Sequence, residues 1–168
     1  MKKIYLARHA TTHYPKQNQQ DRDRPLTEKG LNEASWLSKK MSDVSPSIII
    51  TSSAVRAMET STVIKKTLDR GIELKSFPEL YLAAPQIIYK TLIELSDQHT
   101  TIVLVGHNPG LSQFLFDISG PNSEDTAFQR IYGGLPPAGY GILKSTSTVW
   151  ADLTKENTKL EHIYFPGE

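Results

Sequence analysis

Two arginines and two histidines of this sequence could act together on a doubly charged anion. They are Arg8, His9, Arg56 and His107, and each lies at or soon after the end of a short apolar run. Arginine offers paired N–H donors that match phosphate oxygens, and a neutral imidazole is a nucleophile toward phosphorus. The arginines would also keep His9 unprotonated, since like charges oppose a further proton. These residue types therefore indicate a phosphate site in which a neutral imidazole could attack the phosphoryl group.

For these side chains to meet, the apolar runs must be strands that end at one edge of a sheet. Their lengths and β-branched residues predict buried strands over residues 4–8, 47–51, 72–77 and 101–106. Apolar residues at helical spacing predict helices that begin near Thr27, run over 54–68 and 85–96, and follow Pro109. Strands that alternate with helices form a mostly parallel sheet, and right-handed crossovers place their carboxyl ends at one edge. The four side chains are therefore expected at that edge.

Capping residues support the predicted helices. Thr27 is expected to cap the first helix, whose apolar face is formed by Leu31, Ala34, Leu37 and Met41. The pair Ser52-Ser53 is expected to cap the second helix, which ends at Gly71. Asn108 is expected to cap the helix that Pro109 starts. The helix starts near Ser53 and Asn108 would add backbone N–H donors to the anion site.

The rest of the chain completes the predicted architecture. Residues 16–24 are polar and charged, which is typical of an exposed loop. Alternating runs over 140–145, 148–153 and 160–165 predict antiparallel strands at one edge of the sheet. The expected fold is a three-layer α/β/α sandwich with a mostly parallel central sheet, helices on both faces and an antiparallel C-terminal edge. Residues 1–168 are expected to form a single domain.

Composition excludes several function classes. A formal net charge of +1 gives no reason to expect binding to nucleic acid, or binding to a membrane through a polybasic segment. The absence of cysteine excludes disulfides, thiolate zinc sites and cysteine nucleophiles. The apolar run before Arg8 is too short for a signal peptide, and no run is long enough to cross a bilayer. A reducing cytoplasm is therefore the expected location.

Four segments, in this order, resemble the histidine phosphatase superfamily, which is also called phosphoglycerate mutase-like. They are Leu6-Ala7-Arg8-His9, Arg24-Pro25-Leu26-Thr27-Glu28-Lys29-Gly30, Thr51-Ser52-Ser53-Ala54-Val55-Arg56-Ala57-Met58-Glu59-Thr60 and Val105-Gly106-His107-Asn108-Pro109-Gly110. The match lies within residues 4–110, and the remainder of the chain matches weakly. The small size, the Arg-Pro-Leu-Thr segment and the Gly-His-Asn-Pro segment most resemble the bacterial phosphohistidine phosphatase branch.

The resemblance implies a role for each matching residue. His9 would be the nucleophile that becomes phosphorylated, while Arg8, Arg56 and His107 would bind and polarise the phosphoryl group, with His107 cationic in the complex. Thr12 lies where the family often has a hydroxyl that touches phosphate, and Asn108 belongs to the last phosphate-binding segment. The family uses no metal and no diffusible cofactor. The implied substrate is a phosphorylated protein or a small phosphorylated metabolite.

Some positions depart from the family pattern or stay ambiguous. Ala10 replaces the usual glycine after the histidine, which requires a negative φ, and Ser53 replaces a common proline. Glu79 lies in the segment where many members carry an acidic proton donor, but it could equally be an exposed turn carboxylate. The short chain has no obvious insertions that would enclose a sugar phosphate, which argues against a mutase.

Other functions remain as alternatives at this point. A metal-dependent hydrolase is disfavoured because the sequence has no His-Glu-x-x-His, no His-x-His and few carboxylates near the key histidines. A serine hydrolase is disfavoured because there is no Gly-x-Ser-x-Gly segment. A catalytically silent phosphate-sensing or partner-binding module would not need all four residues. Phosphohistidine protein, nucleotide, sugar phosphate and phosphopeptide all remain open as substrates, and the oligomeric state is open.

Overall fold

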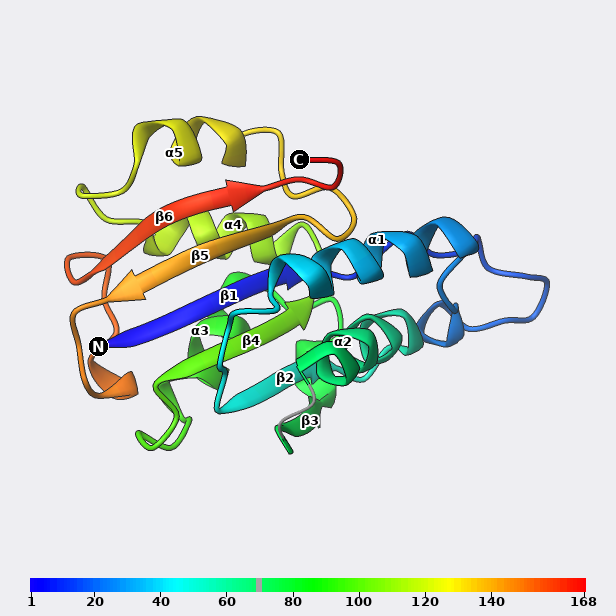
Figure 1. The fold of residues 1–168 in the computed structure, drawn as a ribbon, viewed down its shortest axis with the longest axis horizontal. Coiled ribbons are helices and arrows are strands. Elements are labelled where there is room, and N and C mark those ends of the chain that lie inside the picture. Colours follow the sequence, from blue (N-terminus) through cyan, green and yellow to red (C-terminus); the bar gives the residue numbers. More distant parts are fainter. Residues whose placement is uncertain (69–70) are drawn as a thin grey trace.

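Six strands form one sheet in the order β3-β2-β4-β1-β5-β6. The computed structural model describes residues 1–68 and 71–168. The strands are β1 (Lys2–Arg8), β2 (Ile48–Ser52), β3 (Glu73–Phe77), β4 (Thr101–Gly106), β5 (Tyr140–Ser145) and β6 (Thr158–Tyr164). The first four are parallel, and β5 runs antiparallel to both of its neighbours, β1 and β6 (Figure 1). The prediction of a mostly parallel sheet with an antiparallel C-terminal edge is therefore confirmed.

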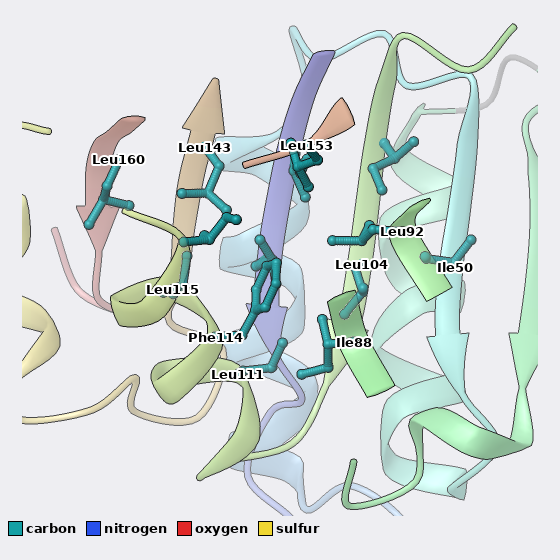
Figure 2. Packing of buried hydrophobic residues seen from close by; sticks show 14 of the residues in the cluster. Ile50, Ile88, Leu92, Leu104, Leu111, Phe114, Leu115, Leu143, Leu153 and Leu160 are labelled. Carbon is teal, nitrogen blue, oxygen red and sulfur yellow. The ribbon is translucent and has the colours of Figure 1, made fainter. Parts of the chain in front are cut away.

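Helices cover both faces of the sheet, as predicted. The helices are α1 (Glu28–Lys40), α2 (Val55–Leu68), α3 (Pro85–Ile93), α4 (Gly110–Ile118) and α5 (Asp125–Ile131). Side chains alternate along β1, so that Tyr5 and Ala7 pack in one hydrophobic cluster with α1 and α2. Ile4 and Leu6 pack in the other cluster, with α3, α4 and α5. Figure 2 shows part of this second cluster, in which Phe114 and other side chains of α4 lie against the strands.

The first helix is capped as predicted, but its buried face differs. Thr27 Oγ1 accepts a hydrogen bond of 2.9 Å from the Gly30 amide, which confirms Thr27 as the N-cap. Leu31, however, is 49 % exposed, so its assignment to the apolar face was wrong. Gly30 takes the buried position instead, because a Cβ there would lie 1.9 Å from the Thr11 carbonyl oxygen. Only glycine permits this close approach of α1 to the loop after β1.

The other predicted helix starts are close to those observed. Helix α2 begins at Val55, and Ser52 Oγ accepts a hydrogen bond from the Ala54 amide at the turn before it. The predicted end of this helix at Gly71 falls next to residues 69–70, which lie outside the described part of the chain. Helix α4 begins at Gly110 after Pro109, and Asn108 does not cap it, because its side chain bonds to other groups.

Two further differences concern the C-terminal third. Residues 148–153 are not a strand but contain the 3₁₀ turn η3 (Trp150–Asp152), whose Trp150 is buried and donates its indole N–H to the His99 carbonyl oxygen. Helix α5 was not predicted, because its seven residues are too few to show a clear helical period. Among the described residues, no helix has both the length and the apolar character that a bilayer crossing requires.

Candidate active site

The carboxyl ends of β1, β2 and β4 lie side by side and carry the predicted site residues. Arg8 ends β1 and is in register with Gly106, the last residue of β4, which His107 follows. Arg56 lies in the first turn of α2, which follows β2. The ring centroids of His9 and His107 are 5.0 Å apart, and Arg56 Nε lies 3.2 Å from His9 Nε2. The sheet order that Figure 1 shows therefore brings His9, Arg56 and His107 to one place.

Hydrogen bonds fix the tautomer of His9. A guanidinium group can only donate, so His9 Nε2 accepts from Arg56 Nε and carries a lone pair. The proton is then on Nδ1, which lies 2.8 Å from the Ala10 carbonyl oxygen and donates to it. Burial lowers the pKa of His9 to about 4, and the charges of Arg56 and Arg8 act in the same direction. His9 is therefore neutral near pH 7, with the nucleophilic nitrogen next to a guanidinium group.

His107 is also neutral in the ligand-free protein. Burial lowers its pKa to about 3, with further lowering by His9 and Arg56. Its Nε2 lies 2.7 Å from Ser52 Oγ, whereas its Nδ1 is buried and has no hydrogen-bond partner within residues 1–68 and 71–168. The sequence-based prediction of a cationic His107 concerns the complex, where a bound dianion would favour the charged ring. The neutral state of His107 in the ligand-free protein therefore does not test that prediction.

Arg8 is held by the chain segment that precedes β5. Its Nη1 donates to the Leu135 carbonyl oxygen over 2.9 Å, and the Asn108 side-chain amide donates to the same oxygen over 2.8 Å. Burial lowers the pKa of Arg8, while the carboxylate of Glu33 opposes the shift. Among the described residues, neither Nε of Arg8 nor Nδ1 of His107 has a hydrogen-bond partner, and both atoms are buried. Buried polar atoms of this kind are rare and have capacity for a ligand oxygen.

Side chains of α1 and α2 hold the loop that follows His9. The Ala10 amide donates to Thr60 Oγ1 over 3.1 Å, and the Thr11 amide donates to Glu33 Oε2 over 2.8 Å. Ala10 is not among the described residues with positive φ, so the negative φ that its alanine side chain was expected to require is present. In the residues that the structure describes, the Thr12 hydroxyl forms no hydrogen bond with Arg8, His9, Arg56 or His107. It donates instead to the Pro25 carbonyl oxygen over 2.7 Å. Its observed role is to hold the next loop in place.

Asp21 is a site residue that the sequence analysis missed. Its Oδ2 accepts from Arg56 Nη2 over 2.9 Å and from the Tyr81 hydroxyl over 2.6 Å, and its backbone oxygen accepts from Arg56 Nη1 over 2.7 Å. The loop of residues 16–24 is mostly exposed, as predicted, but through Asp21, in the 3₁₀ turn η1 (Asp21–Asp23), it is anchored to the site. The hydrogen bond from Tyr81 lowers the pKa of Asp21, and Arg56 lowers it further. Asp21 is therefore an ionised carboxylate at neutral pH.

Tyr81 was also missed. Its ring meets that of His107 edge-on, with centroids 5.6 Å apart, and the Arg56 guanidinium carbon lies 5.9 Å from the ring centroid. Burial and the hydrogen bond to Asp21 both raise the pKa of Tyr81, and the hydrogen bond is the larger cause. The position of Tyr81 soon after β3 could have indicated that it lies near the site. Strand β3 is the parallel neighbour of β2, and β2 leads to Arg56. No signal of residue type distinguished Asp21 from its charged neighbours.

Glu79 is not joined to this cluster. It lies in the 3₁₀ turn η2 (Pro78–Leu80) and lines a separate cavity with Phe77 of β3 and Thr91 of α3. Among residues 1–68 and 71–168, no hydrogen bond or ion pair links it to Arg8, His9, Arg56 or His107. In this conformation, Asp21 is the carboxylate that contacts the cluster, and Glu79 is not.

The chemistry of the donor set suits an anion. The two guanidinium groups offer N–H donors and positive charge, which match phosphoryl oxygens, and the neutral His9 offers a lone pair. Within the described part of the chain, no group of three or more His, Cys, Asp or Glu side chains is placed to hold a metal ion. The arrangement can therefore bind a phosphoryl group and present the unprotonated His9 Nε2 to its phosphorus.

Comparisons with known proteins agree with this geometry. The sequence profile of the histidine phosphatase superfamily (branch 1) matches residues 4–81. The uncharacterized protein ML1117 of Mycobacterium leprae is 31 % identical over 168 residues, which cover 95 % of this chain and 99 % of the relative. The crystal structure of a proposed phosphohistidine phosphatase SixA from Agrobacterium tumefaciens superposes with a TM-score of 0.81 and 26 % identity, covering 98 % of each chain.

A more distant structure has the same fold. The protein histidine phosphatase SixA complexed with tungstate superposes with a TM-score of 0.76 at 15 % identity, covering 98 % of this chain and 97 % of that one. Because the identity is low, this likeness speaks for the fold alone. The fold is thus shared by a protein whose sequence has diverged widely.

Proposed function

The chain belongs to the histidine phosphatase superfamily, and we propose that it removes a phosphoryl group from phosphohistidine or a phosphomonoester through a covalent intermediate on His9. The observation that carries the proposal is the pair of hydrogen bonds on His9. Nδ1 donates to the Ala10 carbonyl oxygen, and Nε2 is left as the unprotonated nitrogen beside Arg56. A histidine in this tautomer is prepared for attack without first losing a proton.

In the first step, the lone pair of His9 Nε2 forms a bond to phosphorus as the bond from phosphorus to the leaving group breaks. The leaving group departs with that electron pair. Positive charge develops on the His9 ring, and the Ala10 carbonyl oxygen stabilises it through the Nδ1–H hydrogen bond. Arg8 and Arg56 would donate to the equatorial oxygens of the phosphoryl group during the transfer.

In the second step, water attacks phosphorus and the bond to His9 Nε2 breaks. The electron pair of that bond returns to the ring as its lone pair, so His9 leaves as a neutral imidazole. The water yields its proton to solvent or to the departing phosphate. No metal takes part in this proposal, because the guanidinium groups supply the positive charge that the transferring phosphoryl group requires.

Phosphohistidine is the favoured substrate class within this proposal. Oxygen leaving groups usually require a proton in the transition state, and nitrogen of a phosphoramidate depends less on a protein donor. The carboxylate that contacts the cluster, Asp21, is held ionised by Tyr81 and Arg56 and is therefore a poor proton donor at neutral pH. The structural relative at 26 % identity is itself described as a proposed phosphohistidine phosphatase. A cytoplasmic location remains a prediction from the sequence.

Trapping of the labelled enzyme tests the proposal. Wild-type protein is mixed with a ³²P-labelled phosphohistidine protein, quenched in alkali and separated, and we expect label on the enzyme that is stable in alkali and lost in acid. His9→Asn should show neither label nor turnover, whereas His13→Asn, an exposed histidine of the same loop, should match the wild type. Turnover by His9→Asn would refute the covalent role of His9. Absence of turnover by the wild type on any phosphorylated substrate would instead favour a silent phosphate-binding module.

A further inference from the structure

Three of the five N–H donors of Arg56, one on each guanidinium nitrogen, are engaged by groups of the protein itself. Its Nε donates to His9 Nε2, its Nη1 to the backbone oxygen of Asp21 and its Nη2 to Asp21 Oδ2. The Arg56 side chain is only 2 % exposed. A phosphoryl group that Arg56 holds through any of these three N–H groups must therefore displace Asp21 or His9 from it.

Asp21 is bound as an oxyanion substrate would be bound. Its Oδ1 forms an ion pair of 2.8 Å with Arg24, while its Oδ2 receives N–H of Arg56 and the hydroxyl of Tyr81. The Asp21 carboxylate is thus bound by the guanidinium groups of Arg24 and Arg56 and by the Tyr81 hydroxyl. Of these groups, Arg56 is the one that would also bind phosphate. Charge-assisted hydrogen bonds of this kind are the ones that phosphoryl oxygens form with arginine.

We propose that Asp21 is an internal competitor for Arg56, which the substrate's phosphoryl group displaces, and that Asp21 thereby sets the affinity of the site for phosphate. The inference rests on the phosphate site of the proposed function and names a further affinity-determining residue of that site. Displacement frees Arg56 Nη2 for a phosphoryl oxygen and moves the guanidinium group away from the lone pair of His9.

The structure makes this exchange feasible. Asp21 lies in a three-residue 3₁₀ turn of an exposed loop, and its side chain is 45 % exposed, so the released carboxylate can return to water. A half-exposed ion pair contributes little free energy, because solvent screens it. A phosphoryl group carries two negative charges and several acceptor oxygens, so it interacts with the same guanidinium group more strongly than one carboxylate does.

An opposite role for Asp21 gives the opposite result. If Asp21 served to hold Arg56 in the orientation that binds phosphate, removal of the carboxylate would weaken anion binding. If Asp21 competes for Arg56, its removal strengthens anion binding. Asp23 provides a matched control, because it lies in the same turn and is exposed, and its replacement by asparagine changes the net charge equally. The comparison therefore separates the local contact from the general effect of charge.

Titration calorimetry with inorganic phosphate and with sulfate at pH 7.5 tests the proposal. We expect Asp21→Asn to bind both anions about two- to fivefold more tightly than Asp23→Asn, which follows from the free energy of a half-exposed ion pair. Tyr81→Phe, which removes one hydrogen bond from Asp21 and keeps its charge, should tighten binding in the same direction by a smaller factor. This second variant carries the test if Asp21→Asn does not fold.

The possible results separate the inference from the proposed function. Binding by Asp21→Asn that is weaker than, or equal to, that of Asp23→Asn overturns the inference, whatever the catalytic activity. Tighter binding supports it even if no turnover is found, because calorimetry requires no reaction. A wild-type protein that binds neither anion overturns both the phosphate site and the competition for it.

Discussion

Replacement of Arg56 by lysine tests how the site uses the shape of the guanidinium group rather than its charge. Arg56 donates from three nitrogens at once, to His9 and to two oxygens of Asp21. Lysine retains the positive charge but presents a single ammonium group, which cannot reproduce the planar fork. The loss of one positioned transition-state donor costs about 10²–10³ in kcat, or roughly 3–4 kcal/mol. We therefore expect Arg56→Lys to lower kcat/KM about a hundredfold, and Arg56→Ala to lower it at least as much.

The assay is steady-state hydrolysis of p-nitrophenyl phosphate at pH 7, with thermal unfolding of each variant to establish that it is folded. Arg130→Lys is the control, because Arg130 lies on α5, where it pairs with Glu168. This control should retain activity within about twofold, as surface substitutions usually have small effects. A loss of less than about fivefold in a folded Arg56→Lys protein would refute the reasoning, since charge alone would then suffice.

Three further predictions concern other parts of the site. Thr60→Val leaves the buried Ala10 amide without its acceptor, so the free energy of unfolding should fall by about 1–3 kcal/mol. Thr62→Val on the same helix is the control, and a loss for Thr60→Val no larger than that of the control would contradict this prediction. Because the pKa values of His9 and His107 are lowered to about 4 and about 3, the unfolded chain binds more protons below pH 6.5. The free energy of unfolding should therefore fall as the pH falls from 6.5 toward 4, at up to about 1.4 kcal/mol per pH unit for each histidine. In a variant that combines His9→Asn and His107→Asn, chemical denaturation should show a free energy of unfolding that depends less on pH. Equal slopes would argue against buried neutral histidines. Glu79→Gln should change turnover of an alkyl phosphate and of phosphohistidine by less than about twofold, because Glu79 lines a separate cavity, and a selective loss on the alkyl phosphate would restore it as the general acid.

The parallel core of the fold could be predicted from sequence because its signals are local. The run Thr101–Gly106 is long enough and apolar enough to be recognised as a buried strand, and Thr27 has both the residue type and the position of an N-cap. The convergence of His9, Arg56 and His107 then follows from the geometry of parallel strands, without knowledge of any side-chain contact.

The remainder depended on contacts between distant segments. Asp21 lies among other charged residues, and only its packing against Arg56, 35 positions later, distinguishes it. Trp150 begins a 3₁₀ turn because its amide and its indole bond to Asp97 and His99, which alternation of residue types cannot reveal. Helical spacing alone placed Leu31 on the buried face of α1. The spacing could not reveal that Gly30 takes the buried position, because this depends on its close approach to the loop after β1.

The central place of β1 in the sheet bears on how the protein matures during synthesis. In the described part of the chain, the first strand forms its strand pairs with β4 on one side and with β5 on the other, and not with β2 or β3 (Figure 1). A nascent chain released only to the end of α3 therefore carries His9, the proposed nucleophile, but lacks both strands that pair with β1. Such pairing over long sequence separations is slow and comes late. Ribosome-bound fragments should consequently be inert, and catalytic competence should emerge only when the chain is nearly complete.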